Sequence, residues 1–173
     1  MTMEITSVTT SELSPSEIDD ITNSVVEAFN VSTGDVSTDV TYVATATLDL
    51  SIPEGTSEEE VVDAVTSTIA ELLNVHPKDV TITSVNLETG EVEYEVASEN
   101  FANAEIVQDA LDELTESQIE DQIQETIPEA TVTRNQVENE IEVDVAIIVD
   151  GSEAGNIGEA QNEVIFRCLV DFQ

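Results

Sequence analysis

Residues 56–96 contain one complete helix, one strand and one hairpin, and this stretch limits the fold more than any other part of the chain. A capping box is predicted at Thr56 with Glu59, because the threonine hydroxyl can accept an amide three residues on and the glutamate can reach back. Pro77 cannot continue a helix, so we expect the helix to end before it. Apolar residues follow the 3.6-residue helical period at Val62, Val65, Ile69, Leu72 and Leu73.

A β-hairpin is expected after this helix. Val80–Leu87 is rich in β-branched residues, which favour strands. Glu88–Gly90 offers a short connection in which glycine can adopt positive φ. In the next strand, apolar residues expected to face inward alternate with acids expected to face water: Val92, Tyr94 and Val96 against Glu91, Glu93 and Glu95.

An earlier segment repeats this pattern 44 residues upstream. Ser14 to Glu17 combines a capping box with a proline at the first helical position. Five residues of the following helix are expected to face inward, each 44 residues before its counterpart: Ile18, Ile21, Val25, Ala28 and Phe29. Asn30-Val31 then recurs as Asn74-Val75, and Asp35-Val36 recurs as Asp79-Val80. The recurrence indicates a duplicated helix–turn–strand unit.

The remaining elements complete an α+β order. Val40–Ile52 alternates over an unusual length, which indicates a strand that is bent or that runs through two subdomains. A helix is expected from Ile106, Val107, Ala110, Leu111 and Leu114. Thr115–Gln118 offers another cap, and Ile119, Ile123 and Ile127 continue in helical register until Pro128. Thr131–Arg134 predicts a short strand. The order β-α-β-β-α-β is typical of a ferredoxin-like layer, with helices on one face of the sheet.

We expect a partial N-terminal β/α unit at residues 1–39, the central domain at 40–136 and C-terminal strands at 137–173. Ile141–Val149 alternates as a strand, and a glycine-dotted loop follows at 151–158. The last predicted strand has one apolar face made of Val164, Phe166, Cys168, Val170 and Phe172. These five residues are the candidate subunit interface. Two arrangements remain open, because the tail can pair with the N-terminal unit of its own chain or with a neighbouring subunit.

The chain has 39 acidic residues against 3 basic ones, a net charge of −36. Such a charge repels nucleic acid and anionic membranes, so both classes of partner are excluded. No apolar stretch reaches the roughly 20 residues of a membrane span. No signal peptide is visible in Met1–Thr10. The acids are expected to form a solvated surface, on which divalent cations can collect.

No catalytic site is predicted. His76 is the only histidine and lies in an expected turn, and Cys168 is the only cysteine, so an internal disulfide is excluded. Asp150–Glu153 resembles part of a calcium loop but lacks the spacing of an EF-hand. No dedicated metal or cofactor site is therefore expected.

Leu73–Val85 resembles a unit of repetitive extracellular proteins of microalgae and other protists, in which a helix ends in Leu-x-Val-x-Pro-x-Asp-Val-x-Val-x-x-Val. The layout of residues 40–96 is also similar to SEA-like β/α modules of extracellular proteins. The resemblance implies an extracellular structural or adhesive role and supplies no catalytic residues.

These features lead us to expect a non-enzymatic, acidic structural subunit of an extracellular assembly, a filament built from copies of the same chain. One alternative is an acidic domain of a salt-adapted organism with an enzymatic or small-ligand-binding role. Another is a calcium-buffering matrix protein. The salt-adapted alternative predicts unfolding at low salt, where self-repulsion is unscreened.

Overall fold

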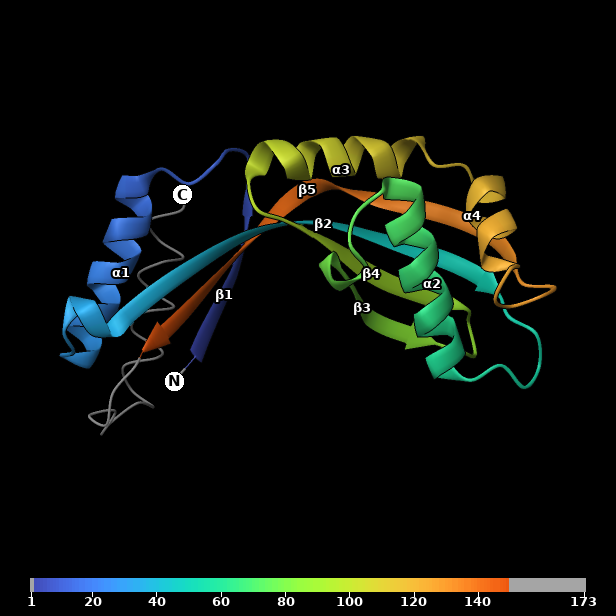
Figure 1. Cartoon of the computed structure of the whole chain (residues 1–173), viewed down its shortest axis with the longest axis horizontal. Coiled ribbons are helices and arrows are strands. Elements are labelled where there is room, and N and C mark those ends of the chain that lie inside the picture. The colour runs from blue at the N-terminus through green and yellow to red at the C-terminus, as the bar shows by residue number, and fades with distance from the viewer. Residues whose placement is uncertain (1, 150–173) are drawn as a thin grey trace. The chain divides into compact units, whose positions relative to one another are not determined.

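The computed structural model describes residues 2–149, which form both strands and helices (Figure 1). The strands are β1 (Thr2–Thr9), β2 (Val36–Ser51), β3 (Val80–Asn86), β4 (Glu91–Ser98) and β5 (Thr131–Val149). The helices are α1 (Pro15–Phe29), α2 (Glu58–Leu73), α3 (Phe101–Glu113) and α4 (Glu116–Ile123), with 3₁₀ turns η1 (Thr33–Asp35) and η2 (Pro77–Asp79). The predicted loop at 151–158 and the predicted last strand lie outside the described residues.

The protein is an α+β protein with a five-stranded antiparallel sheet in the order β1-β5-β2-β4-β3. Its described residues divide into two units. The central unit contains residues 42–142, and the end unit contains residues 2–41 and 143–149. Strands β2 and β5 contribute residues to both units. The predicted three-segment division stays a prediction, because much of its last segment is not described.

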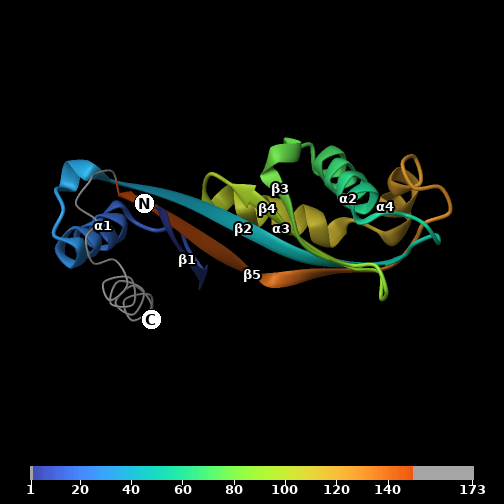
Figure 2. The ribbon, with the colours of Figure 1, turned by 90° about the horizontal axis from the view of Figure 1, so that it is seen from below.

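In the central unit, α2, α3 and α4 cover one face of the sheet (Figure 2). Strands β2 and β4 pair antiparallel with Leu48 opposite Val92 and Ala46 opposite Tyr94, and these four side chains are fully buried. Because side chains alternate across a strand, this register turns every second residue toward the helices. Burying such apolar surface is the main force that holds the layers together.

The β3–β4 hairpin confirms the predicted alternation. Val92, Tyr94 and Val96 are fully buried, whereas Glu91 and Glu93 are exposed. Gly90 lies in the left-handed region at φ +80° and donates its amide to the Asn86 carbonyl at 2.7 Å. Glycine adopts this conformation without the steric penalty of a Cβ.

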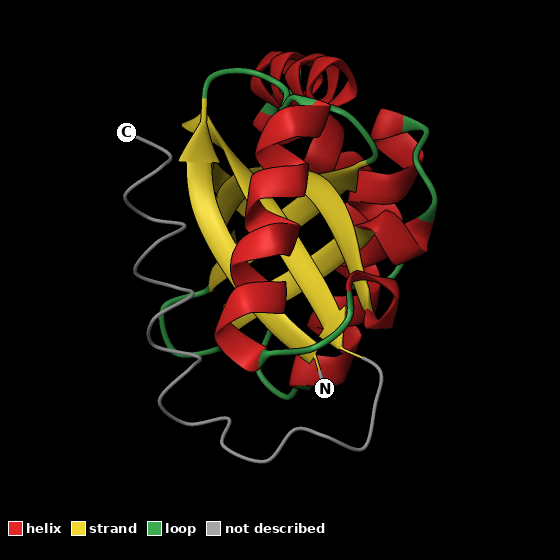
Figure 3. Ribbon diagram, turned by 90° about the vertical axis from the view of Figure 1, so that its left-hand side faces the viewer, coloured by secondary structure: helices red, strands yellow, loops and turns green. Residues whose placement is uncertain are grey.

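In the end unit, α1 lies against the strands (Figure 3). The predicted capping box is confirmed, with Ser14 and Glu17 exchanging hydrogen bonds at the first turn of α1. Thr6 Oγ1 of β1 donates to Asp144 Oδ1 of β5 at 2.5 Å. Thr22 Oγ1 of α1 lies 2.8 Å from Thr38 Oγ1 of β2. These contacts join helix and strands in the unit.

The repeated turn has the same local structure in both copies. Asn30 ends α1 at φ 51°, and Asn74 ends α2 at φ 54°, so both helices close with a left-handed asparagine. A 3₁₀ turn follows each asparagine, and strands β2 and β3 then begin at Val36 and Val80. The spacing of 44 residues is kept through cap, turn and strand start.

The predicted cap and core of α2 are partly wrong. Ser57 begins the helix and forms the capping box with Glu60, one residue later than the predicted pair. Of the predicted core positions, Val65 and Ile69 are buried, but Val62, Leu72 and Leu73 are only half-buried. Helix α2 packs on β3, α3 and α4 at once. Its fully buried stripe is therefore broader and rotated: Val61, Ala64, Val65, Thr68, Ile69 and Ala70.

Two further boundaries differ from the prediction. The strands expected at 131–134 and 141–149 are one continuous strand, because residues 135–140 extend the sheet with little burial. The predicted cap at Thr115 is confirmed and begins α4 after an extended Leu114, but α4 ends at Ile123, before the predicted end at Ile127. Ile106, predicted to face inward, is 66% exposed, whereas Ala104 and Leu111 are the buried residues of α3.

Candidate subunit interface at the β3 edge

The five predicted interface residues lie outside the described part of the chain: Val164, Phe166, Cys168, Val170 and Phe172. His76 is exposed, as its turn position indicated. Its Nδ1 accepts the Lys78 amide at 3.1 Å and so caps the turn η2. This hydrogen bond gives the histidine a structural role in the turn before β3.

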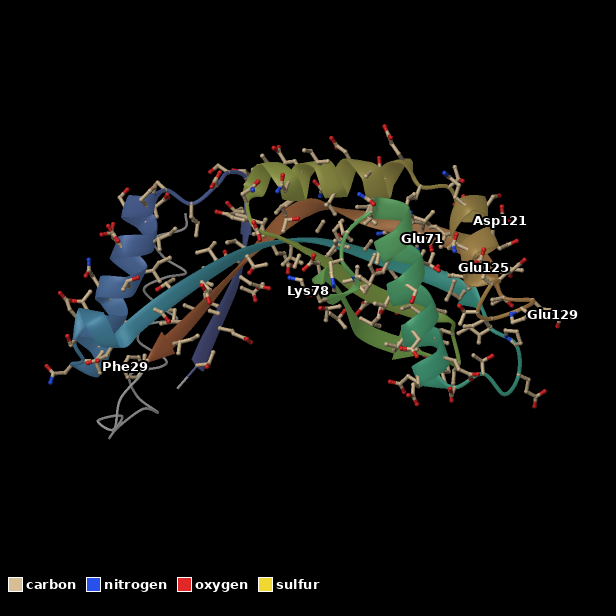
Figure 4. All side chains as sticks on the ribbon, viewed as in Figure 1. Phe29, Glu71, Lys78, Asp121, Glu125 and Glu129 are labelled. Carbon is tan, nitrogen blue, oxygen red and sulfur yellow. The ribbon has the colours of Figure 1, made fainter. Side chains whose placement is uncertain are left out.

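Acidic side chains project from the surface without forming a metal centre in residues 2–149. Asp121, Glu125 and Glu129 illustrate this on α4 and the turn after it (Figure 4). The calcium-loop fragment at 150–153 lies beyond the described residues. None of the helices in the described range is both long and apolar enough to cross a bilayer.

Among the strands of residues 2–149, β3 is an edge of the sheet, with β4 as its neighbour on one side. In a protein with a net charge of −36, residues 80–87 carry no charged side chain at all. A register shift between Ile82 and Ser84 adds one residue to the strand, which is a β-bulge. Natural edge strands usually carry charges or prolines that prevent pairing with other chains. Apart from the bulge, β3 lacks these protections.

The register with β4 assigns each side chain of β3 to a face. Three residues lie opposite buried residues of β4 and face the helices: Val80 opposite Val96, Ile82 opposite Tyr94 and Val85 opposite Val92. Three polar residues lie opposite acids on the helix-free face: Thr81 opposite Glu95, Ser84 opposite Glu93 and Asn86 opposite Glu91. The edge therefore has one apolar side and one polar side lined by carboxylates.

Apolar residues next to this edge are incompletely buried. We define the apolar rim as Leu72 and Leu73 of α2, Val75 of the connection, and Ile82 and Val85 of β3. All five pack against the core of the central unit but remain partly accessible. Leu87, just beyond β3, is 44% exposed. A further layer on this edge would remove additional apolar surface from water.

Two of the described basic residues lie close to acidic side chains. Lys78 Nζ lies 3.5 Å from Asp79 Oδ1, and Arg134 Nη1 lies 3.8 Å from Asp49 Oδ2. The two basic side chains are largely exposed, and the two aspartates are partly exposed. Exposed pairs of this kind contribute about 0–1 kcal/mol. Asp49 also lies directly opposite Glu91 across the β2–β4 ladder, where like charges repel. The third basic residue, Arg167, is in the tail beyond the described residues.

Tyr94 is the one tyrosine whose hydroxyl is buried without a hydrogen-bond partner in the described residues. It belongs to the core cluster of the central unit and is 0% exposed. Burial raises its pKa well above the ordinary value, because the phenolate would lose its hydration. Tyr94 therefore contributes to the packing of the core of the central unit.

Sequence reasoning placed the interface in the tail and missed the β3 edge. The sequence contained one sign of this edge, because residues 80–87 carry no charged side chain in an otherwise acidic chain. Which strand forms an edge, however, depends on the sheet order, and the linear sequence does not contain it. Comparison with family models, curated proteins and solved structures found no match for this chain.

Proposed function

We propose that the protein is a non-enzymatic, acidic structural subunit that associates with copies of itself, building a filament in an extracellular assembly. The observation that carries the proposal is the uncharged β3 edge flanked by the apolar rim. Strand addition along such an edge joins subunits through backbone hydrogen bonds. The acidic surface elsewhere keeps the copies from associating at random.

We also propose that the central unit has the ferredoxin-like, SEA-like layout expected from the sequence. The order β2-α2-β3-β4-α3-β5 with strand order β5-β2-β4-β3 supports this assignment. The resemblance of Leu73–Val85 to extracellular protist proteins supports the location outside the cell. The extra helix α4 is an addition to the six-element order.

Negative-stain microscopy of the full chain tests the proposed function. Filaments or regular oligomers are expected, and acidification toward pH 4 or added Ca²⁺ should increase light scattering because carboxylate repulsion falls. Folded monomers under all these conditions would contradict self-association. A chain that unfolds in dilute buffer and refolds in concentrated salt would instead favour the salt-adapted alternative, which circular dichroism detects.

A further inference from the structure

We propose that Asn30 is an N-glycosylation site and carries an oligosaccharide on its side-chain amide. The inference goes beyond the proposed self-association and rests only on the proposed location outside the cell. Asn30-Val31-Ser32 is the acceptor pattern Asn-x-Ser, with a residue other than proline in the middle. No other asparagine of the chain has a serine or threonine two residues later.

Asn30 lies in an exposed turn of the end unit, where α1 stops. Its backbone has φ 51° and ψ 44°, and its backbone amide donates to the Val26 carbonyl. The amide of Val31 donates to the same carbonyl at 3.2 Å, so the course of the turn is set by backbone hydrogen bonds. Asn30 and Ser32 are both exposed to solvent. A bulky glycan on the side-chain amide can therefore project into water without displacing any of these bonds.

The second copy of the turn shows that a serine is not needed to build it. Asn74 ends α2 in the same left-handed conformation and is also exposed, but His76 stands where the first copy has Ser32. The His76 side chain caps its 3₁₀ turn by accepting the Lys78 amide. Ser32 makes no side-chain cap hydrogen bond at the matching position. Its hydroxyl does not stabilise the turn, which leaves it available to an enzyme that recognises the acceptor.

The reaction uses both side chains of the pattern. The donor is an oligosaccharide linked through C1 of its first sugar to a polyprenyl pyrophosphate. Nδ2 of Asn30 attacks C1, so that the Nδ2–C1 bond forms and the C1–O bond to the pyrophosphate breaks. The lipid pyrophosphate leaves with the bonding electrons, and the proton lost from Nδ2 passes to a basic group of the transferase. The Ser32 hydroxyl is the group through which the transferase holds the acceptor.

Mass spectrometry of the full-length chain tests the assignment. The chain would be isolated from the cells that naturally make it, and would also be secreted from yeast behind a cleavable leader. Cleavage after acidic residues releases Asn30 in the peptide 28–35 and Asn74 in the peptide 72–79. We expect a glycan on the peptide 28–35 and none on the peptide 72–79, which contains the same turn without the acceptor hydroxyl.

Ser32→Ala and Ser32→Thr are the matched variants in yeast. Ser32→Ala removes the hydroxyl but keeps the left-handed Asn30, so the secreted chain should lose the glycan completely. Ser32→Thr keeps a hydroxyl and should keep the glycan. Because the Ser32 side chain makes no cap hydrogen bond, both variants should give the circular dichroism spectrum of the native sequence.

Three results would overturn the inference: an unmodified Asn30 in the naturally made chain, a glycan that persists in Ser32→Ala, or equal modification of Asn74. Sedimentation of the same natural material separates this inference from the proposed function. Chains that associate but carry no glycan would reject the glycosylation site and leave self-association standing. Glycosylated chains that stay monomeric would support the site and reject self-association.

Discussion

The backbone of Leu50 closes over Gly90 so tightly that a Cβ at position 90 would lie 1.7 Å from the Leu50 carbonyl oxygen. The amide of Leu50 also donates to the Gly90 carbonyl at 2.8 Å. This contact fastens the tip of the β3–β4 hairpin to the end of β2. It therefore helps to hold β3, the proposed edge for self-association, in its place in the central unit.

Gly90→Ala should destabilise the protein strongly. Positive φ costs a residue with a Cβ about 1–2 kcal/mol, and displacing the Leu50 backbone adds about 1–3 kcal/mol. Gly55→Ala is the matched control, because Gly55 has φ +96° but open space around its Cα. Chemical denaturation should show a clearly larger loss of unfolding free energy for Gly90→Ala. Equal losses would mean that the contact with Leu50 relaxes freely.

Ser57→Ala should destabilise α2 by about 1 kcal/mol, because the first-turn amide of Glu60 loses its side-chain acceptor. Thr56→Ala is the control, since the Thr56 hydroxyl donates to the Pro53 carbonyl and takes no part in the cap. Thermal unfolding monitored by circular dichroism compares the two variants. A larger loss from Thr56→Ala would return the cap to the position predicted from the sequence.

The same cap makes a prediction about pH. Hydrogen bonds from the Ser57 amide and hydroxyl lower the pKa of Glu60. A lowered folded-state pKa gives stability that is present above the unfolded pKa of about 4.3 and lost as the pH falls through the folded value. NMR titration should therefore show the pKa of Glu60 rising toward its ordinary value in Ser57→Ala. In Thr56→Ala it should stay low.

Tyr94→Phe should leave stability unchanged or raise it by about 1 kcal/mol, because the buried hydroxyl has no partner in the described residues. Burial raises the pKa of Tyr94, so its contribution is intact below the unfolded pKa of about 10 and declines as the pH rises above it. Denaturation at pH 8 and at pH 11 should show a smaller alkaline loss for Tyr94→Phe than for the native chain. A variant that is less stable at pH 8 would reveal a hydrogen-bond partner for the hydroxyl.

Local patterns predicted the hairpin well and the helix start less well. The alternation of Val92 and Glu93 is a short-range signal, so the faces of β4 could be assigned from the sequence alone. At the start of α2, Thr56 and Ser57 each have a glutamate three residues later, so two capping boxes compete. In the structure Ser57 forms the capping box with Glu60, and the Thr56 hydroxyl donates to the Pro53 carbonyl instead.

The middle of β5 and the β3 edge could not be predicted from the sequence, because both depend on contacts between distant parts of the chain. Residues 135–140 are almost entirely polar and show no clear alternation. Asn135 lies in β5, and its side-chain amide donates to the Leu111 carbonyl of α3 at 3.1 Å, a contact 24 residues away. The β3 edge likewise emerges only from the strand order. Both features depend on long-range pairing that propensity does not encode.

Ser84→Lys should weaken self-association through β3 by about tenfold, because lysine on an edge strand discourages strand addition. Ser67→Lys on the exposed side of α2 adds the same charge to a net charge of −36 and serves as the control. If general charge repulsion alone limited association, the added positive charge would make both variants associate more readily than the native chain. Light scattering at matched concentrations separates the two explanations, and stronger association of Ser84→Lys would argue against the β3 edge.

Sedimentation velocity of the native full-length chain tests the central claim most directly. Measured over a range of concentrations at neutral pH and again with added Ca²⁺, a self-associating subunit gives species larger than the monomer whose fraction grows with concentration. The cation should shift this growth to lower concentration, because bound charge reduces repulsion between acidic copies. A single folded monomer at every concentration, with and without Ca²⁺, would contradict the proposal that this protein is a structural subunit.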